Sequence, residues 1–86
     1  MKLFACKNQH SYGGGCILVA ANNKTEAYLT AANKFELPFF WKDNKPDGKV
    51  EHCESDTYPY DSWFEVEHLS ADVSTPQIIF EDHYTE

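Results

Sequence analysis

The chain has 86 residues, of which 42% are hydrophobic and 15% aromatic, and its formal net charge is -7. This length fits one domain spanning residues 1–86, and the apolar content excludes a disordered chain. Residues 51–86 carry ten acids and neither Lys nor Arg, which disfavours binding to nucleic acid or to an anionic membrane surface.

The first element expected from the sequence is a β-hairpin near the start of the chain. Residues 2–7 and 16–21 are short apolar runs, and the segment between them contains three consecutive glycines at 13–15. Glycine adopts the positive φ angles that a reversing loop needs, so the two runs are predicted to pair as antiparallel strands. The second run is apolar throughout, which is typical of a central strand.

A helix is expected directly after this hairpin. Asn23 is a favourable N-cap, and Glu26 lies three residues later, which is the spacing of a capping box. Pro38 limits how far the helix extends, because the residue before a proline avoids the helical conformation. Residues at helical spacing form one apolar stripe that is predicted to pack on a sheet: Tyr28, Ala31, Ala32 and Phe35.

The stretch from residue 36 to residue 61 is predicted to be a long, partly ordered loop. It contains turn-forming residues at 45–48 and around Pro59, and residues 49–53 are a candidate for a short extra strand. Many of the aromatic residues lie in this stretch or beside it. We interpret them as a satellite core beneath the loop, with an exposed anchor patch as the alternative.

Two further strands are expected over residues 62–69 and 77–84. They are predicted to form a second hairpin through a turn at 70–76. Alternation places the apolar residues of both strands, such as Phe64 and Phe80, on the face toward the helix. The acids between them then lie on the opposite face.

These elements predict an α+β fold of ββαββ order, with an antiparallel sheet of about four strands and one helix on its apolar face. The open face would then hold several carboxylates close together. Such crowding costs electrostatic repulsion, which a binding role explains and a purely structural role does not require. The alternative is that the acids only keep the protein in solution. The candidate partner-binding residues are Glu65, Glu67, Glu81, Asp82, Trp63, Tyr58 and Tyr60.

Cysteine usage bears on the compartment and on metal binding. Cys6, Cys16 and Cys53 are an odd number, which favours free thiols in a reducing compartment. Since the N-terminal residues form no apolar run long enough for a signal sequence, we expect a protein of the cytoplasm. Cys6 and Cys16 are equidistant from Ser11, so a symmetrical hairpin would bring them together. With His10 nearby, a zinc site or a redox pair is an alternative to inert buried thiols.

The glycine-rich loop is a second candidate binding region, made of His10, Ser11, Tyr12, Gly13, Gly14 and Gly15. Its backbone N–H groups could approach a phosphate or a sugar, although the loop precedes a strand and lacks the ending of a P-loop. A flexible hairpin loop is the simpler interpretation. We assign no catalytic residues, no metal and no cofactor, because no nucleophile, base and orienting group can be assigned together.

The order of several segments resembles that of short bacteriophage and prophage proteins. The matching segments are KLFACK, the glycine-rich turn, ILVAAN, the Thr-Glu-Ala helix start, EVEHLSA after Trp63 and the closing PQIIFEDHY. The resemblance implies a ββαββ build and a mobile-element setting in a bacterial host cell, and it implies no site residues. The glycine-rich loop and the stretch 38–60 depart from it.

The sequence therefore predicts a small, acidic, non-enzymatic binding protein. Its acidic and aromatic face would dock on a basic host protein, such as a nucleic-acid-handling or defence enzyme, and modulate or inhibit it. One alternative is a small-ligand or metal-binding protein that uses the glycine-rich loop with Cys6 and Cys16. The other is an oligomeric structural or assembly protein, for example a homodimer.

Overall fold

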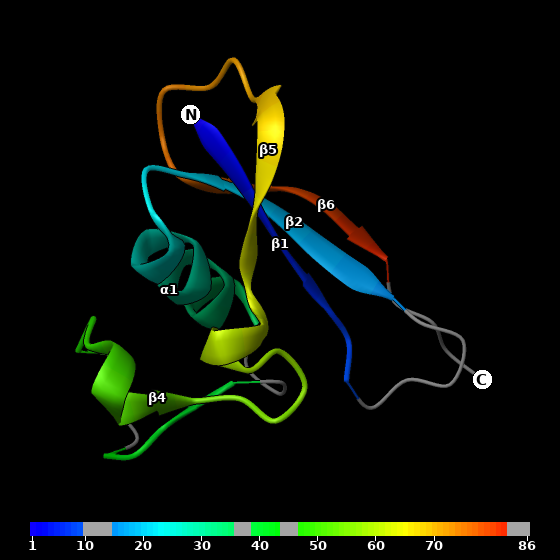
Figure 1. Ribbon diagram of the computed structural model, residues 1–86. Coiled ribbons are helices and arrows are strands. Elements are labelled where there is room, and N and C mark those ends of the chain that lie inside the picture. Colours follow the sequence, from blue (N-terminus) through cyan, green and yellow to red (C-terminus); the bar gives the residue numbers. More distant parts are fainter. Residues whose placement is uncertain (10–14, 36–38, 44–46, 83–86) are drawn as a thin grey trace.

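The computed structural model describes residues 1–9, 15–35, 39–43 and 47–82 (Figure 1). Four strands form an antiparallel sheet in the order β5-β1-β2-β6, and β3 and β4 form a separate two-stranded sheet. The elements are β1 (Lys2–Lys7), β2 (Cys16–Ala21), α1 (Lys24–Lys34), β3 (Phe40–Trp41), β4 (Cys53–Glu54), β5 (Phe64–Ser70), β6 (Gln77–Asp82) and two 3₁₀ turns, Val50–His52 and Tyr60–Ser62. The α+β class is confirmed, whereas the predicted ββαββ order is incomplete because β3 and β4 intervene.

The first hairpin forms as predicted. Each residue of β1 pairs with one of β2 without interruption, from Lys2 opposite Ala21 to Lys7 opposite Cys16. The backbone N–H of Asn8 donates to the carbonyl of Gly15 at 3.0 Å and so closes the ladder at the loop end. Both strands are central in the sheet, which explains why the second apolar run is buried along most of its length.

Helix α1 begins where the sequence indicates and ends at Lys34, so that Phe35, the last residue of the predicted stripe, is an extended C-cap residue. The side chain of Asn23 accepts a hydrogen bond from the backbone N–H of Glu26 at 2.8 Å. The carboxylate of Glu26 accepts in return from the backbone N–H of Asn22 at 2.9 Å, one residue earlier than in a standard capping box. The predicted stripe faces the sheet: Tyr28, Ala31 and Ala32 are buried, and Phe35 packs against the same core.

The core lies between the sheet and a second layer made of α1 and the segment 39–63 (Figure 1). Tyr28 is at its centre, with its ring centroid 5.4 Å from that of Phe39 and 6.4 Å from that of Trp63, both edge to face. The indole N–H of Trp63 donates to the carbonyl of Tyr58 at 3.2 Å. Phe39, Tyr58 and Trp63 therefore belong to the main core and not to a separate satellite core, while Phe40 is 52% exposed.

The long segment has more regular structure than a loop. Phe40 and Trp41 of β3 pair with Glu54 and Cys53 of β4, so the segment forms a small sheet of its own. The extra strand predicted at 49–53 is wrong in position: Val50–His52 form a 3₁₀ turn, and the strand begins at Cys53.

The second predicted hairpin is wrong. β5 pairs with β1 and β6 pairs with β2, so the two strands lie at opposite edges of the sheet. Residues 71–76 therefore connect one edge to the other past the ends of β1 and β2 (Figure 1). Two hydrogen bonds hold this connection, because the amino group of Met1 donates to the carbonyl of Ala71 and the N–H of Ala71 donates to the carbonyl of Met1.

Candidate functional site

The face of the sheet opposite α1 carries a row of apolar side chains across all four strands. The register places Phe64 of β5 opposite Ala5, Ala5 opposite Leu18, and Leu18 opposite Phe80 of β6. Opposed residues in antiparallel strands share a face, so these four residues form one line, which we call the open-face row. Phe64 is 54% exposed and Phe80 52% exposed, while Ala5 and Leu18 between them are half-buried.

The strands at the two ends of this row are irregular. β6 has a register shift between the pairs at Leu18 and Val19, which leaves Ile79 as an extra residue beside Phe80. Ile79 is 42% exposed and so adds to the apolar surface. β5 has a larger irregularity, near which His68 adopts a φ of 63°. Bulges of this kind re-aim side chains at sheet edges.

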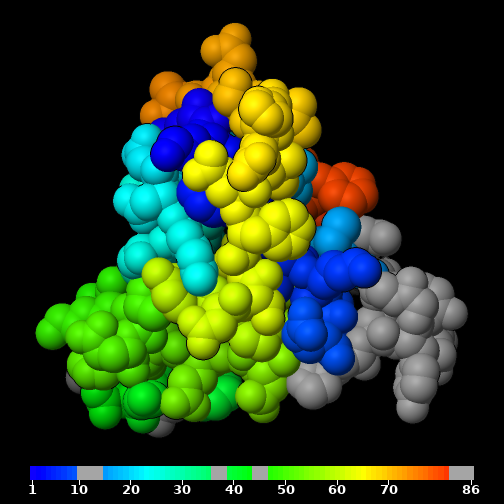
Figure 2. Space-filling view, viewed as in Figure 1, coloured from blue at the N-terminus to red at the C-terminus, as the bar shows by residue number. Residues whose placement is uncertain are grey.

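The neighbours of the open-face row on the same face follow from the same registers. Toward the start of β1, the next pair on this face is Leu3 and Ala20, and both are buried. In the other direction the register pairs Lys7 with the half-buried Cys16, and Cys16 in turn with Asp82, so charged positions flank the row at this end. Figure 2 shows yellow atoms of β5 and red atoms of β6 at the surface, with blue atoms of the first hairpin between them.

The prediction that Glu65 and Glu81 lie on the open face of the sheet is wrong. Glu65 is opposite Phe4, and Glu81 is opposite Ile17. Phe4 and Ile17 belong to the core on the α1 side of the sheet. The carboxylates of Glu65 and Glu81 therefore lie on the α1 side of the two edge strands, and the open face carries Phe64 and Phe80 in their place. The reason is that alternation defines two faces of a strand without deciding which of them the helix covers.

The predicted acidic residues are also not gathered in one place. Glu65 and Glu81 are on opposite edges, with two strands between them. Glu65 forms an exposed ion pair with Lys2, with 3.7 Å between the carboxylate oxygen and the ammonium nitrogen. Glu67 is exposed in the irregular part of β5. Asp82 is opposite Cys16, and its side chain lies outside the described part of the chain.

Two of the three predicted aromatic anchors are buried. Tyr58 is 1% exposed and Trp63 is 3% exposed, so neither side chain is accessible to a partner. Tyr60 is half-buried: its hydroxyl is 2.9 Å from that of Thr25, and the ammonium of Lys24 lies 4.4 Å from its ring centroid. The accessible aromatic residues of the sheet are Phe64 and Phe80, although strand alternation alone predicts them on the face toward the helix.

The thiols do not form the predicted pair. Cys6 is opposite Ile17 and Cys16 is opposite Lys7, so the two side chains are one residue out of register and on opposite faces. Burial raises the pKa of Cys6 to about 12 and also raises the pKa of Cys53, which disfavours the thiolate that metal binding or redox chemistry requires. In the described ranges, no three potential metal-ligating side chains come together. The loop residues 10–14 lie outside those ranges, and Gly15 has a φ of 117°.

One titratable pair was not anticipated. The imidazole Nδ1 of His52 contacts a carboxylate oxygen of Asp47, and the backbone N–H of Lys49 donates to the other oxygen at 3.0 Å. The hydrogen bond with His52, and then that from Lys49, hold the pKa of Asp47 below its usual range. Both side chains are about one-third exposed, and the pair ties the ends of the turn that precedes β4.

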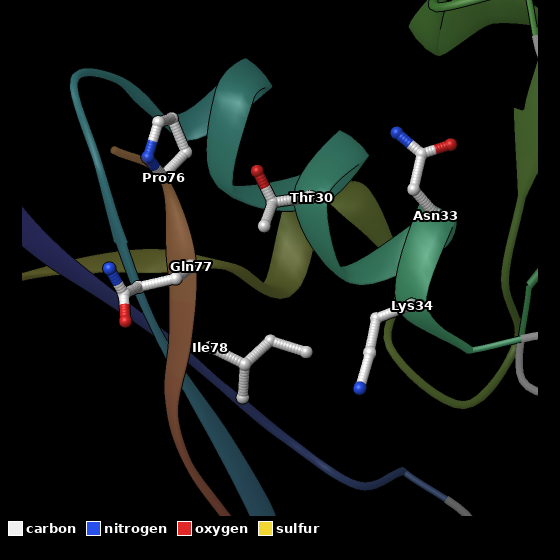
Figure 3. Close-up of a pocket in the computed structure, with 6 residues that line it drawn as sticks. All are labelled: Thr30, Asn33, Lys34, Pro76, Gln77 and Ile78. Atoms are coloured by element: carbon white, nitrogen blue, oxygen red, sulfur yellow. The ribbon is translucent and has the colours of Figure 1, made fainter.

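A shallow hollow of about 420 Å³ lies between α1 and β6 (Figure 3). Its lining residues are Thr30, Asn33, Lys34, Pro76, Gln77 and Ile78. The polar side chains do not converge, since those of Asn33 and Gln77 point apart and the hydroxyl of Thr30 already donates to the carbonyl of Glu26. The hollow is therefore a weaker candidate for a binding site than the open-face row.

Comparisons with known proteins assign no family: no family model, no curated protein and no solved structure matches this chain. In the described part of the chain, no helix has the length and apolar composition needed to cross a membrane. The open-face row is thus the main feature from which a function can be argued. A sequence signal for it exists in QIIF, where three consecutive apolar residues cannot all face one core by strict alternation.

Proposed function

We propose that this chain is a non-catalytic protein-binding domain whose binding surface is the open face of the β5-β1-β2-β6 sheet. The observation that supports the proposal most directly is the open-face row. Large aromatic side chains are frequent hot spots of protein interfaces, and clustered exposed apolar side chains on a small protein mark interaction sites. Phe64 and Phe80, each about half exposed, supply two such anchors on a rigid sheet.

The charge of the chain narrows the class of partner. A protein of net charge -7 repels phosphates and anionic headgroups, which favours a protein over nucleic acid or a membrane. The described carboxylates from Glu51 to Glu81 are all exposed, and two of them pair with lysines, Glu54 with Lys42 and Glu65 with Lys2. A basic surface on another protein, as expected from the sequence, remains a second candidate for the partner.

A photo-crosslinking experiment tests the binding surface. A benzoyl-phenylalanine would replace Phe64 or Phe80, and the matched control would carry it at Phe40, which is equally exposed at 52% but belongs to β3. The purified chain, alone and in bacterial extract, would then be irradiated. We expect discrete polypeptide adducts from positions 64 and 80, lost when the other phenylalanine is changed to Ser.

Two results would contradict the proposal. One is the absence of any discrete adduct from positions 64 and 80, both alone and in extract. The other is an adduct that forms equally well from position 40, since contact would then not depend on the open face. A captured basic protein whose yield falls as salt is added would support the second candidate for the partner.

A further inference from the structure

We propose that the occupant of the open face is a second copy of this chain, so that two sheets pack face to face as a twofold homodimer. This inference rests on the proposed function, in which the open face is a protein-binding surface. It goes further by naming the partner, and three properties of the face favour this partner over an unrelated protein: the shape of the row, the placement of charge, and the thickness of the molecule.

The open-face row is complementary to itself. Its largest side chains, Phe64 and Phe80, are at the two ends, and the small Ala5 is near the middle. A twofold axis parallel to the strands and lying between two such faces would place Phe64 over the partner's Phe80, and Phe80 over the partner's Phe64. Such an isologous contact uses the same residues from both copies, which is the usual arrangement of homodimers.

The charges permit two copies to meet on this face. Each copy has a formal net charge of -7, so like-charge repulsion opposes association over most of the surface. The register pairs Lys7 and Asp82 with Cys16 next to the row, whereas Glu65 and Glu81 are on the α1 side of the edge strands. Approach through the open faces therefore keeps these carboxylates of the two copies apart.

The third property that favours a homodimer is the thickness of the molecule. Its principal extents are 34 × 33 × 19 Å, and one layer, formed by α1 and the segment that contains Phe39, Tyr58 and Trp63, packs on the sheet. A second sheet packed about 10 Å away would give the open face the cover that a β-sandwich has.

The size of the face sets the expected strength of the dimer. Four strands of six or seven residues span roughly 20 by 20 Å, or about 400 Å² on each copy. This is less than the roughly 800 Å² per partner of a standard stable interface, so the dimer is reversible and depends on concentration. Because screening weakens the repulsion between two acidic copies, added salt should strengthen it, whereas salt would weaken binding to a basic partner.

Sedimentation equilibrium from low micromolar to near-millimolar concentration tests the proposal. We expect the wild-type chain to shift from the mass of one copy to that of two, and to shift at lower concentration when salt is added. The double variants Phe64→Glu/Phe80→Glu and Phe64→Lys/Phe80→Lys should each stay at the mass of one copy. An equimolar mixture of the two variants should regain the mass of two, because opposite charges then face one another whichever way the strands are aligned.

The control variant is Phe40→Glu, which changes an equally exposed phenylalanine on the small sheet and should dimerise like the wild type. Circular dichroism checks that each variant is folded, and the regained dimer in the mixture is evidence of folding in itself. The proposal is overturned if the wild type keeps the mass of one copy throughout, or if the double variants dimerise as it does. Cross-links from 64 and 80 to another protein only would refute the homodimer while leaving the proposed function standing.

Discussion

At the scale of single residues, Tyr28 joins the helix to the long segment. Its ring packs edge to face against Phe39 and Trp63, and its buried hydroxyl donates to the carbonyl of Cys53 at 3.1 Å. Burial is the largest cause of the raised pKa of Tyr28, so the phenol stays protonated and remains a donor. Tyr28 thereby fixes the start of β4 relative to α1.

Loss of this hydroxyl should measurably destabilise the protein. Tyr28→Phe removes a buried donor and leaves the carbonyl of Cys53 without it, which should lower the free energy of unfolding by about 1 to 2 kcal/mol. Tyr60→Phe is the matched control, since its hydroxyl contacts Thr25 near the surface and should contribute about 0.5 kcal/mol or less. Urea unfolding of both variants would measure the difference, and equal losses would contradict the role given to Tyr28.

Residues differ in how far their position could be predicted. The burial of Tyr28 was predicted because it belongs to a stripe at helical spacing, and such a stripe has one way to face a sheet. Phe64 and Phe80 were placed on the wrong face because each lies in an alternating strand whose two faces are both chemically acceptable. Tyr58 and Trp63, proposed as surface anchors, are buried because large aromatic side chains fill much of so small a core.

At the scale of elements, α1 is specified locally. At its N-terminus, Asn23 accepts from the N–H of Glu26, which the helix itself leaves unpaired, and Glu26 accepts from the N–H of Asn22 just before the helix. At its other end the N–H of Phe35 donates to the carbonyl of Ala31 at 3.0 Å.

Loss of the N-cap side chain should lower the free energy of unfolding more than loss of another asparagine side chain on the same helix. Asn23→Ala should lower the free energy of unfolding by about 1 kcal/mol, the usual cost of losing an N-cap. The control is Asn33→Ala, an exposed position within α1, where alanine should be neutral or slightly stabilising because of its helix propensity. Thermal unfolding followed by circular dichroism would compare them, and a larger loss at position 33 would contradict the capping assignment.

The strands show which features short-range sequence patterns predict and which they do not. The first hairpin was predicted within its observed bounds, because a glycine-rich loop joins two apolar runs of equal length. The same rules predicted a hairpin for β5 and β6, and the structure places them at opposite edges. A connection of six residues permits either arrangement, and the choice depends on distant groups, such as the hydrogen bonds between Met1 and Ala71.

At the scale of the whole molecule, the core is on one side of the sheet. Phe39 is 2% exposed in that core, whereas Phe64 is 54% exposed on the other side. The exposed fractions of these two phenylalanines therefore distinguish the covered face of the sheet from the open face.

The asymmetry of the two faces predicts unequal costs of truncation. Phe39→Ala should lower the free energy of unfolding by about 3 to 5 kcal/mol, since it leaves a cavity in the core. Phe64→Ala should cost well under half of that when the protein is dilute enough to be monomeric. Denaturant unfolding at low and high protein concentration would measure both, and only the Phe64→Ala cost should grow with concentration. Equal costs in dilute solution would contradict the assignment of faces.

The sequence by itself determined the α+β class, the first hairpin, the start of α1 and its buried stripe, because short-range periodicity, capping and turn chemistry specify each of them. The tertiary structure alone decided which strands are neighbours, which face of β5 and β6 the helix covers, and that Cys6 and Cys16 lie on opposite faces. These features depend on contacts between residues far apart in the chain, and alternation along one strand is satisfied equally well by either face.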